Sequence, residues 1–145
     1  MKTINFYGVS YRYGEFSNFS LHPITIDDKV WPTTEHYFQA MKFNDTDYQE
    51  EIRQVDAPLR AKQLGNSRSK PLRADWESVK DDVMRKAVLA KFTQHTDLRD
   101  ILLSTGEAHL VEHAKYDAYW GDGYADGKNM LGVILMEVRG QIKEK

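Results

Sequence analysis

The sequence predicts an α+β fold, in which a single, mainly helical domain of about six helices carries a small antiparallel β-sheet. The first observation is order along the chain, because strand-like segments come first and segments with helical spacing of apolar residues follow. The second is size, since 145 residues with 41% hydrophobic content are enough for one core. The third is uniformity, because no repeat, linker or low-complexity tract divides the chain. We therefore expect residues 1–145 to form one domain.

The expected strands are short and bounded by turn-forming residues. They cover residues 4–7, 23–26, 29–31 and 108–113. The second and third are separated by Asp27 and Asp28, which predicts a hairpin with its turn at these two residues. This hairpin supplies the expected antiparallel sheet.

Six helices are expected, over residues 33–43, 45–55, 57–65, 75–93, 97–104 and 129–142. Thr33 and Asp75 are good N-cap residues for the first and fourth helices. Gly65 and Gly106 are the expected stops of the third and fifth. The last helix has apolar residues around most of its circumference, which predicts a central position.

Composition excludes several classes of function. The chain has no cysteine, which rules out disulfides, thiolate catalysis and cysteine-based metal sites. A formal net charge of −2 disfavours a protein that coats long nucleic acid through charge alone. Neither an N-terminal signal core nor an apolar run of about 18 residues is present, so we expect a cytoplasmic protein without a membrane segment.

One stretch resembles a metal site. His109, Glu112 and His113 match the inverted zinc-protease pattern H-x-x-E-H. The stretch has the character of a strand rather than a helix, and in a strand the two histidines lie about 13 Å apart, too far to bind one ion. We therefore expect no metal ion at this stretch.

A basic loop precedes the fourth helix. Arg68, Ser69 and Lys70 offer guanidinium, hydroxyl and ammonium donors together, a set that suits a phosphate group. Trp76 follows at the start of the helix, so a phosphorylated ring compound is an attractive ligand. The alternative is a solvated basic face with Trp76 in the core.

A glycine-rich loop, residues 119–129, precedes the last helix. Such a loop can direct backbone N–H groups at an anion, with Lys128 as an added charge. The alternative is an ordinary turn with Asn129 as helix cap. Trp120, which lies between Tyr119 and a glycine, favours a loop that stacks on a ligand.

The first helix carries a polar stripe. Glu35, Gln39 and Lys42 are spaced at i, i+4 and i+7, so they share one face. Glu35 lies in the first turn, where the helix dipole favours an ionised carboxylate. The sequence leaves two roles open for Glu35, catalysis or stabilisation of the helix alone.

These blocks together resemble a known family, the YbiA-like N-glycosidases of the NADAR superfamily. The likeness covers nearly the whole chain in order. The matching segments are residues 4–7, 16–19, 31–40, 68–73, 75–80, 110–113, 117–123 and 127–132. The resemblance implies hydrolysis of the ribosyl C–N bond in phosphoribosylamino-pyrimidines, which are early riboflavin-pathway intermediates, with release of ribose 5-phosphate.

The resemblance also implies roles for individual residues. The family's glutamate on the first helix falls on Glu35, its aromatic platform on Trp76, and its aspartate on Asp122 or, as second choice, Asp117. We expect Glu35 to stabilise an oxocarbenium-like sugar and to activate water, while Asp122 orients ribose hydroxyls or water. This chemistry requires neither a metal nor an organic cofactor. The remaining expected contacts with a small, phosphorylated, nucleotide-like substrate are Asn18, Phe19, Arg68, Lys70, Tyr119, Trp120, Gly121, Lys128 and Asn129.

Two other functions fit the same residues. The first is an ADP-ribosyl-guanine hydrolase, the activity of other NADAR branches, which would make nucleic acid a partner. The second is a non-catalytic module that binds ADP-ribose or a nucleotide. A binder has little reason to direct the Glu35 carboxylate at an electron-poor carbon, so this residue separates the last alternative from the enzymes.

Overall fold

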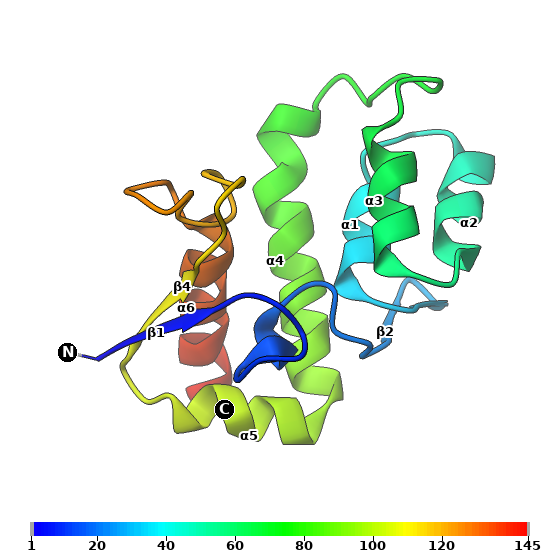
Figure 1. Cartoon of the computed structure of the whole chain (residues 1–145). Coiled ribbons are helices and arrows are strands. Elements are labelled where there is room, and N and C mark those ends of the chain that lie inside the picture. Colours follow the sequence, from blue (N-terminus) through cyan, green and yellow to red (C-terminus); the bar gives the residue numbers. More distant parts are fainter. Residues whose placement is uncertain (1, 145) are drawn as a thin grey trace. The chain divides into compact units, whose positions relative to one another are not determined.

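The computed structural model describes residues 2–144 and confirms the α+β class, with six α-helices in that part of the chain. Its elements are β1 Thr3–Phe6, a short 3₁₀ helix η1 Gly14–Phe16, β2 Ile24–Ile26, β3 Lys29–Trp31, α1 Thr34–Ala40, α2 Thr46–Gln54, α3 Pro58–Asn66, α4 Trp76–Gln94, α5 Thr96–Ser104, β4 His109–Glu112 and α6 Met130–Lys143 (Figure 1). They form two compact units, which we describe separately. Unit 1 comprises Met1–Ser20 and Phe92–Lys145, and unit 2 comprises Leu21–Lys91.

The predicted hairpin lies in unit 2. Strands β2 and β3 pair antiparallel, with Ile24 opposite Trp31. Asp27 and Asp28 have φ angles of 54° and 64°, the left-handed pair that a type I′ turn needs, and aspartate tolerates this region better than most residues. The hairpin buries Ile24, Ile26 and Trp31 in the core of unit 2.

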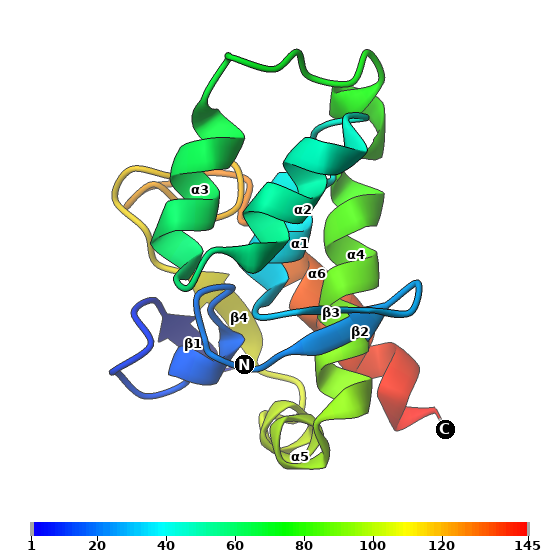
Figure 2. The ribbon, with the colours of Figure 1, turned by 90° about the vertical axis from the view of Figure 1, so that its right-hand side faces the viewer.

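Helix α1 is the central helix of unit 2. It packs against α2, α3 and β3, and all seven of its residues are buried (Figure 2). Thr33 caps it as predicted, because its hydroxyl accepts a hydrogen bond of 3.1 Å from the N–H of His36. The helix ends at Ala40, earlier than expected, since the following turn closes with shorter-range hydrogen bonds from Lys42 and Phe43. The polar stripe of α1 therefore lies in the interior of unit 2.

Gly65 does not stop α3 as predicted. It lies inside the last turn, and the helix continues to Asn66. A Cβ atom at this position would overlap the side-chain amide of Gln39 on α1. The absence of a side chain at Gly65 thus serves close packing of α1 against α3 rather than termination of the helix.

Unit 1 contains a pairing that the sequence did not predict. Strands β1 and β4 pair in parallel, with Ile4 opposite Leu110, although more than a hundred residues separate them in the chain. Helix α6 packs against β4. A Cβ atom at Gly132 would overlap the carbonyl oxygen of Leu110, so this glycine lets α6 approach the strand closely. The buried residues of α6, among them Ile134 and Leu135, lie on one face, so the apolar surround expected from the sequence is buried on one side of the helix only.

Within residues 2–144, no helix is both long enough and apolar enough to cross a membrane.

Candidate functional site

Glu35 lies in the first turn of α1 with a buried side chain, only 7% of which is exposed. The Nε2 atom of Gln39, one turn further along, donates a hydrogen bond of 2.7 Å to Glu35 Oε2. An acid that served only the helix N-terminus could keep its carboxylate in water, because a buried carboxylate costs free energy unless it is well partnered. The burial of Glu35 therefore favours a chemical role.

Lys42, in the turn that follows α1, is a second buried charged residue, with 8% exposure. Burial lowers the pKa of Lys42 to about 8, although the opposite charge of Glu35 raises it, and the positive charges of Arg68 and Lys62 lower it further. Its ammonium group lies 3.4 Å from Asn66 Oδ1. Near neutral pH about a tenth of these side chains is an uncharged amine. A lysine of this kind can exchange protons or act as a nucleophile.

Gln39 is held between Glu35 and Gly65. Its Nε2 atom serves Glu35, while its Oε1 atom is buried and has no hydrogen-bond partner among the described residues. This oxygen occupies the space that a Cβ of Gly65 would need. An unpaired buried acceptor is destabilising, so the orientation of the amide toward Glu35 is retained at a cost in stability.

Three residues that the site needs in unit 2 were not among the predicted site residues: Lys42, Gln39 and Gly65. The helical spacing placed Lys42 and Gln39 beside Glu35, but spacing cannot show that a face is buried. No signal in the sequence linked Gly65 to this stripe.

Trp76, the predicted stacking platform, is buried at the start of α4 with 6% exposure. Its ring meets Phe38 edge-to-face, with 5.1 Å between centroids. The ammonium of Lys42 lies 5.7 Å from the same Phe38 ring. The ring of Phe38 therefore lies between Trp76 and Lys42. The burial of Trp76 also agrees with the alternative, in which this residue belongs to the core.

The basic loop of unit 2 is exposed and partly paired within itself. Arg68 donates hydrogen bonds of 2.9 Å to the carbonyl oxygens of Gly65 and Ser67. Lys70 lies 3.5 Å from Asp45 in an exposed ion pair. Exposed ion pairs contribute little free energy, so a phosphate can replace Asp45 as the partner of Lys70 at small cost.

The remaining predicted residues lie in unit 1. In the glycine-rich loop, Asp117 Oδ1 accepts hydrogen bonds from the N–H groups of Tyr119 and Trp120, at 3.0 and 2.8 Å. Trp120 is half-buried and meets the Tyr119 ring edge-to-face at 4.9 Å. Asp117 thus shapes the turn that presents Trp120.

Asp122 is engaged through both carboxylate oxygens. Oδ2 lies 2.8 Å from His113 Nδ1, and Oδ1 accepts from the N–H groups of Ala114 and Tyr124. Burial favours a higher pKa for Asp122, but the hydrogen bonds from His113, Tyr124 and Ala114 outweigh it and lower the pKa. Asp122 is therefore an ionised carboxylate that organises the loop.

The predicted anion cradle of this loop does not form as expected. The N–H groups of Gly123, Gly127 and Lys128 donate to carbonyl oxygens of residues 117, 122 and 118, at 3.0, 3.0 and 2.8 Å. These three donors are therefore already paired. The ammonium of Lys128 lies 5.3 Å from the Tyr119 ring centroid, and its contact with an anion stays a prediction.

Hydrogen bonds of Asn129 connect the glycine-rich loop to β4 and to the start of α6. Asn129 Oδ1 accepts from the N–H of Glu112, and its Nδ2 donates to the Leu110 carbonyl, both at 2.9 Å. The N–H of Asn129 donates to the Gly121 carbonyl at 3.0 Å. The Asn129 side chain thus ties the start of α6 to β4 and does not cap the helix.

Asn18 and Phe19 follow η1 and are half-buried, with the Phe19 N–H held by Ser17 Oγ at 3.1 Å. The predicted site residues therefore fall into two groups. Glu35, Arg68, Lys70 and Trp76 belong to unit 2, and Asn18, Phe19, Tyr119, Trp120, Gly121, Asp122, Lys128 and Asn129 belong to unit 1.

The zinc-like pattern takes the predicted strand form, as β4 begins at His109 and ends at Glu112. His113 pairs with Asp122 instead. Within the described residues, no cluster of three histidine or acidic side chains is placed to hold a metal ion.

Comparison with known proteins agrees with these features. Residues 5–143 match the family model of the NADAR domain. The chain is 60% identical to N-glycosidase YbiA of Escherichia coli over 96% of this chain and 88% of that protein. It is 46% identical to N-glycosidase Npun_R5314 of Nostoc punctiforme, covering 97% of this chain and 93% of the relative.

Two further matches extend the comparison. The NMR structure of E. coli YbiA superimposes with a TM-score of 0.92 at 58% identity, covering 99% of this chain and 86% of that one. A Vibrio vulnificus riboflavin biosynthesis protein is 40% identical over 97% of this chain but only 39% of its own length. The resemblance inferred from the motifs is thereby confirmed, and the chain belongs to the NADAR family.

Proposed function

We propose that this N-glycosidase hydrolyses the ribosyl C–N bond of phosphoribosylamino-pyrimidines and releases ribose 5-phosphate. Relatives named as N-glycosidases support hydrolysis of N-glycosyl compounds as the class of activity. A relative named for riboflavin biosynthesis supports the pyrimidine substrate. The observation that carries the proposal is the buried Glu35, which Gln39 holds by a hydrogen bond and which is close enough to Lys42 to influence the pKa of that lysine.

Glu35 meets the main demand of the reaction. Cleavage of the C–N bond leaves positive charge on the sugar, and a carboxylate beside C1′ stabilises that charge. Water then forms the new C1′–O bond and gives a proton to Glu35, while the departing nitrogen takes a proton in turn. The hydrogen bond from Gln39 keeps the Glu35 carboxylate in one orientation for both steps.

Lys42 supplies the proton for the leaving amine in this proposal. A pKa of about 8 lies close to neutral pH, which is the range in which a general acid works best. After that transfer the neutral amine is also a candidate nucleophile at the sugar carbon. Borohydride added during turnover separates the two roles, because reduction attaches the sugar to the enzyme only if an imine with Lys42 forms.

Arg68 and Lys70 are the proposed partners of the 5-phosphate. Arg68 is close enough to Lys42 to influence its pKa, so a phosphate at Arg68 would lie near the stripe of α1. Trp76 and Trp120 remain proposed contacts of the pyrimidine, and Asp122 remains the proposed second carboxylate. The other predicted contacts of unit 1 are proposed on the family resemblance alone.

Side-by-side turnover tests the substrate. We expect release of ribose 5-phosphate from a phosphoribosylamino-pyrimidine to be faster, in kcat/KM, than release of ADP-ribose from ADP-ribosylated guanine. The reverse order would assign the chain to the ADP-ribosyl-guanine hydrolases, which use the same chemistry on another substrate. Binding of either compound without release would indicate a non-catalytic module and would refute the proposal.

A further inference from the structure

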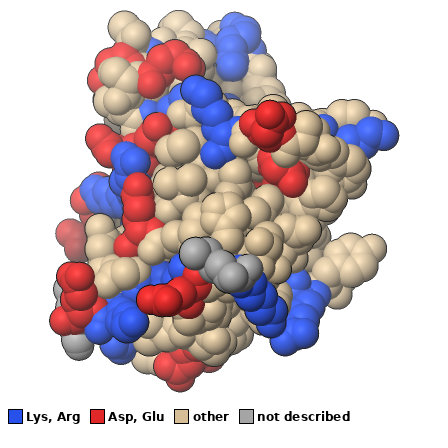
Figure 3. Space-filling model, turned by 90° about the vertical axis from the view of Figure 1, so that its left-hand side faces the viewer, with Lys and Arg blue, Asp and Glu red and all other residues tan. Residues whose placement is uncertain are grey.

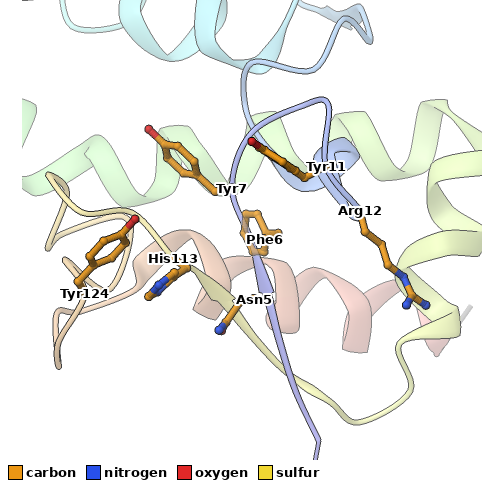
Figure 4. Close-up of a pocket in the computed structure, with 7 residues that line it drawn as sticks. All are labelled: Asn5, Phe6, Tyr7, Tyr11, Arg12, His113 and Tyr124. Atoms are coloured by element: carbon orange, nitrogen blue, oxygen red, sulfur yellow. The ribbon is translucent and has the colours of Figure 1, made fainter.

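A groove of about 200 Å³ lies in unit 1 on the solvent-facing side of β1 (Figure 4). Ile4 and Phe6 of β1 are buried, whereas Asn5 and the following Tyr7 are exposed. The chain segment after β4 lies alongside, because the N–H of His113 donates to the Phe6 carbonyl at 2.9 Å. Asn5, Tyr7 and His113 thus contribute to one surface.

One wall of the groove is an exposed tyrosine pair. Tyr7 and Tyr11 are 59% and 74% exposed. A turn holds Tyr11 in place, since its N–H donates to the Gly8 carbonyl and its own carbonyl accepts from Gly14. A Cβ atom at Gly8 would lie only 3.2 Å from the Tyr11 ring, so the missing side chain lets this ring fold back over the turn.

The opposite wall is a stacked pair of rings. His113 and Tyr124 lie with centroids 4.3 Å apart and an interplanar angle of 18°. Asp122 fixes both residues, because one oxygen binds His113 Nδ1 and the other accepts from the Tyr124 N–H. Tyr124 has a φ of 61°, which non-glycine residues rarely adopt, yet its ring is 57% exposed. Such a conformation is a reason to look for a function.

The polar groups in the groove define a ligand. Flat rings of tyrosine and histidine stack on a planar base whatever its sequence. The Asn5 amide and His113 Nε2 can form hydrogen bonds with the edge of such a base. Arg12, at one end of the groove, carries a guanidinium 5.0 Å from the Tyr13 ring centroid, and a guanidinium suits a phosphate. A planar base joined to a phosphate is a nucleotide.

We propose that this groove binds one nucleotide, with its base against Tyr7, Tyr11 and the His113–Tyr124 pair and its phosphate at Arg12. No residue that lines the groove is among those assigned to the glycosidase reaction. The site gives a purpose to the exposed tyrosines and to the strained Tyr124, which the reaction leaves unexplained. Asp122, the proposed second carboxylate of the reaction, also positions two rings of the groove.

Calorimetric titration with adenosine 5′-monophosphate tests the site. We expect Tyr7→Leu and Tyr124→Leu each to weaken binding about 10-fold, because each removes one stacking ring. Arg12→Gln should weaken binding of the monophosphate but leave that of adenosine unchanged. Tyr116→Leu is the matched control, since Tyr116 is 91% exposed and does not line the groove, and it should bind as the wild type does.

Two further measurements complete the test. A short single-stranded oligoadenylate that binds over 100-fold tighter than the monophosphate would identify the nucleotide as part of a strand, while similar affinities would identify a free nucleotide. Release of ribose 5-phosphate by the same variants reports the proposed reaction separately. Absence of saturable monophosphate binding, or binding that neither tyrosine variant weakens, would overturn the proposal.

Discussion

At the scale of single residues, burial changes the chemistry of an ordinary helical charge pattern. Glu35 and Lys42 would be an unremarkable acid and base on a solvated helix, where their charges would be screened by water. Inside unit 2 the same side chains are 7% and 8% exposed, and the pKa of Lys42 falls to about 8. The sequence could identify Glu35 as a candidate by resemblance and spacing, but it could not show this burial.

The lowered pKa of Lys42 makes a prediction about stability. The pKa is about 8 in the folded protein and 10.5 for an unperturbed lysine, so between these values the unfolded chain binds more protons than the folded one. Unfolding free energy should therefore rise with pH in this window, by about 2 kcal/mol toward pH 10 relative to a Lys42→Met variant. Urea unfolding of both proteins at several pH values measures the difference. A difference that stays constant from pH 8 upward would show that Lys42 is not desolvated.

At the scale of elements, α1 packs closely against α3 beside the proposed catalytic residue Glu35. The unpaired Oε1 of Gln39 occupies the space beside Gly65, and the amide thereby turns its Nε2 toward Glu35. No residue of α3 needs to touch a substrate for this contact to matter. The sequence predicted both helices, yet it suggested a helix stop for Gly65, because a glycine near a helix end is read that way unless the packing is known.

A substitution at Gly65 tests this contact. Helix propensity alone predicts that Gly65→Ala stabilises the protein by about 0.5–1 kcal/mol. We expect the opposite, a loss of about 1–3 kcal/mol with at least a 10-fold loss of turnover, because the new methyl group displaces the Gln39 amide. The control is Gly140→Ala in α6, where an added Cβ atom meets nothing within 4 Å. This variant should be more stable than the wild type. Equal behaviour of the two variants in thermal unfolding would remove Gly65 from the account.

The hydrogen bonds by which the Asn129 side chain connects α6 to β4 give a third prediction. Asn129 has a φ of 51°, which glycine adopts more easily, so conformation alone favours Asn129→Gly. The variant loses a buried hydrogen bond to Leu110 and a partly buried one from Glu112, and we expect it to unfold about 2–3 kcal/mol more easily. Denaturant titration measures this value. A stability equal to or above that of the wild type would mean that these two hydrogen bonds do not stabilise the protein.

At the scale of the whole molecule, the sequence predicted the class of fold and the order of its elements, but not all pairings. The hairpin of β2 and β3 was predictable because its turn residues lie within the segment itself. The parallel pairing of β1 with β4 was not, since no local pattern relates residues so far apart. The prediction of an anion-binding loop was wrong for a similar reason. The N–H groups of Gly123, Gly127 and Lys128 donate to carbonyl oxygens that come close only when the loop is folded.

The distribution of charged side chains agrees with a small-molecule substrate rather than with long nucleic acid. Acidic and basic side chains are interspersed on the face shown in Figure 3, and the formal net charge is −2. A protein that binds long nucleic acid usually gathers basic residues into a continuous patch. The basic loop with Arg68 and Lys70 is better matched to a single phosphate group.

The most direct test of the account is the rate of ribose 5-phosphate release by a Glu35→Gln variant, measured in a single turnover on a phosphoribosylamino-pyrimidine. We expect release to fall by about 100-fold or more, because the variant cannot stabilise the sugar cation or accept a proton, while folding and substrate binding persist. Glu51→Gln on α2, whose side chain is exposed, is the matched control and should act as the wild type. Release at nearly the wild-type rate by Glu35→Gln would contradict the central claim that this buried carboxylate breaks the glycosidic bond.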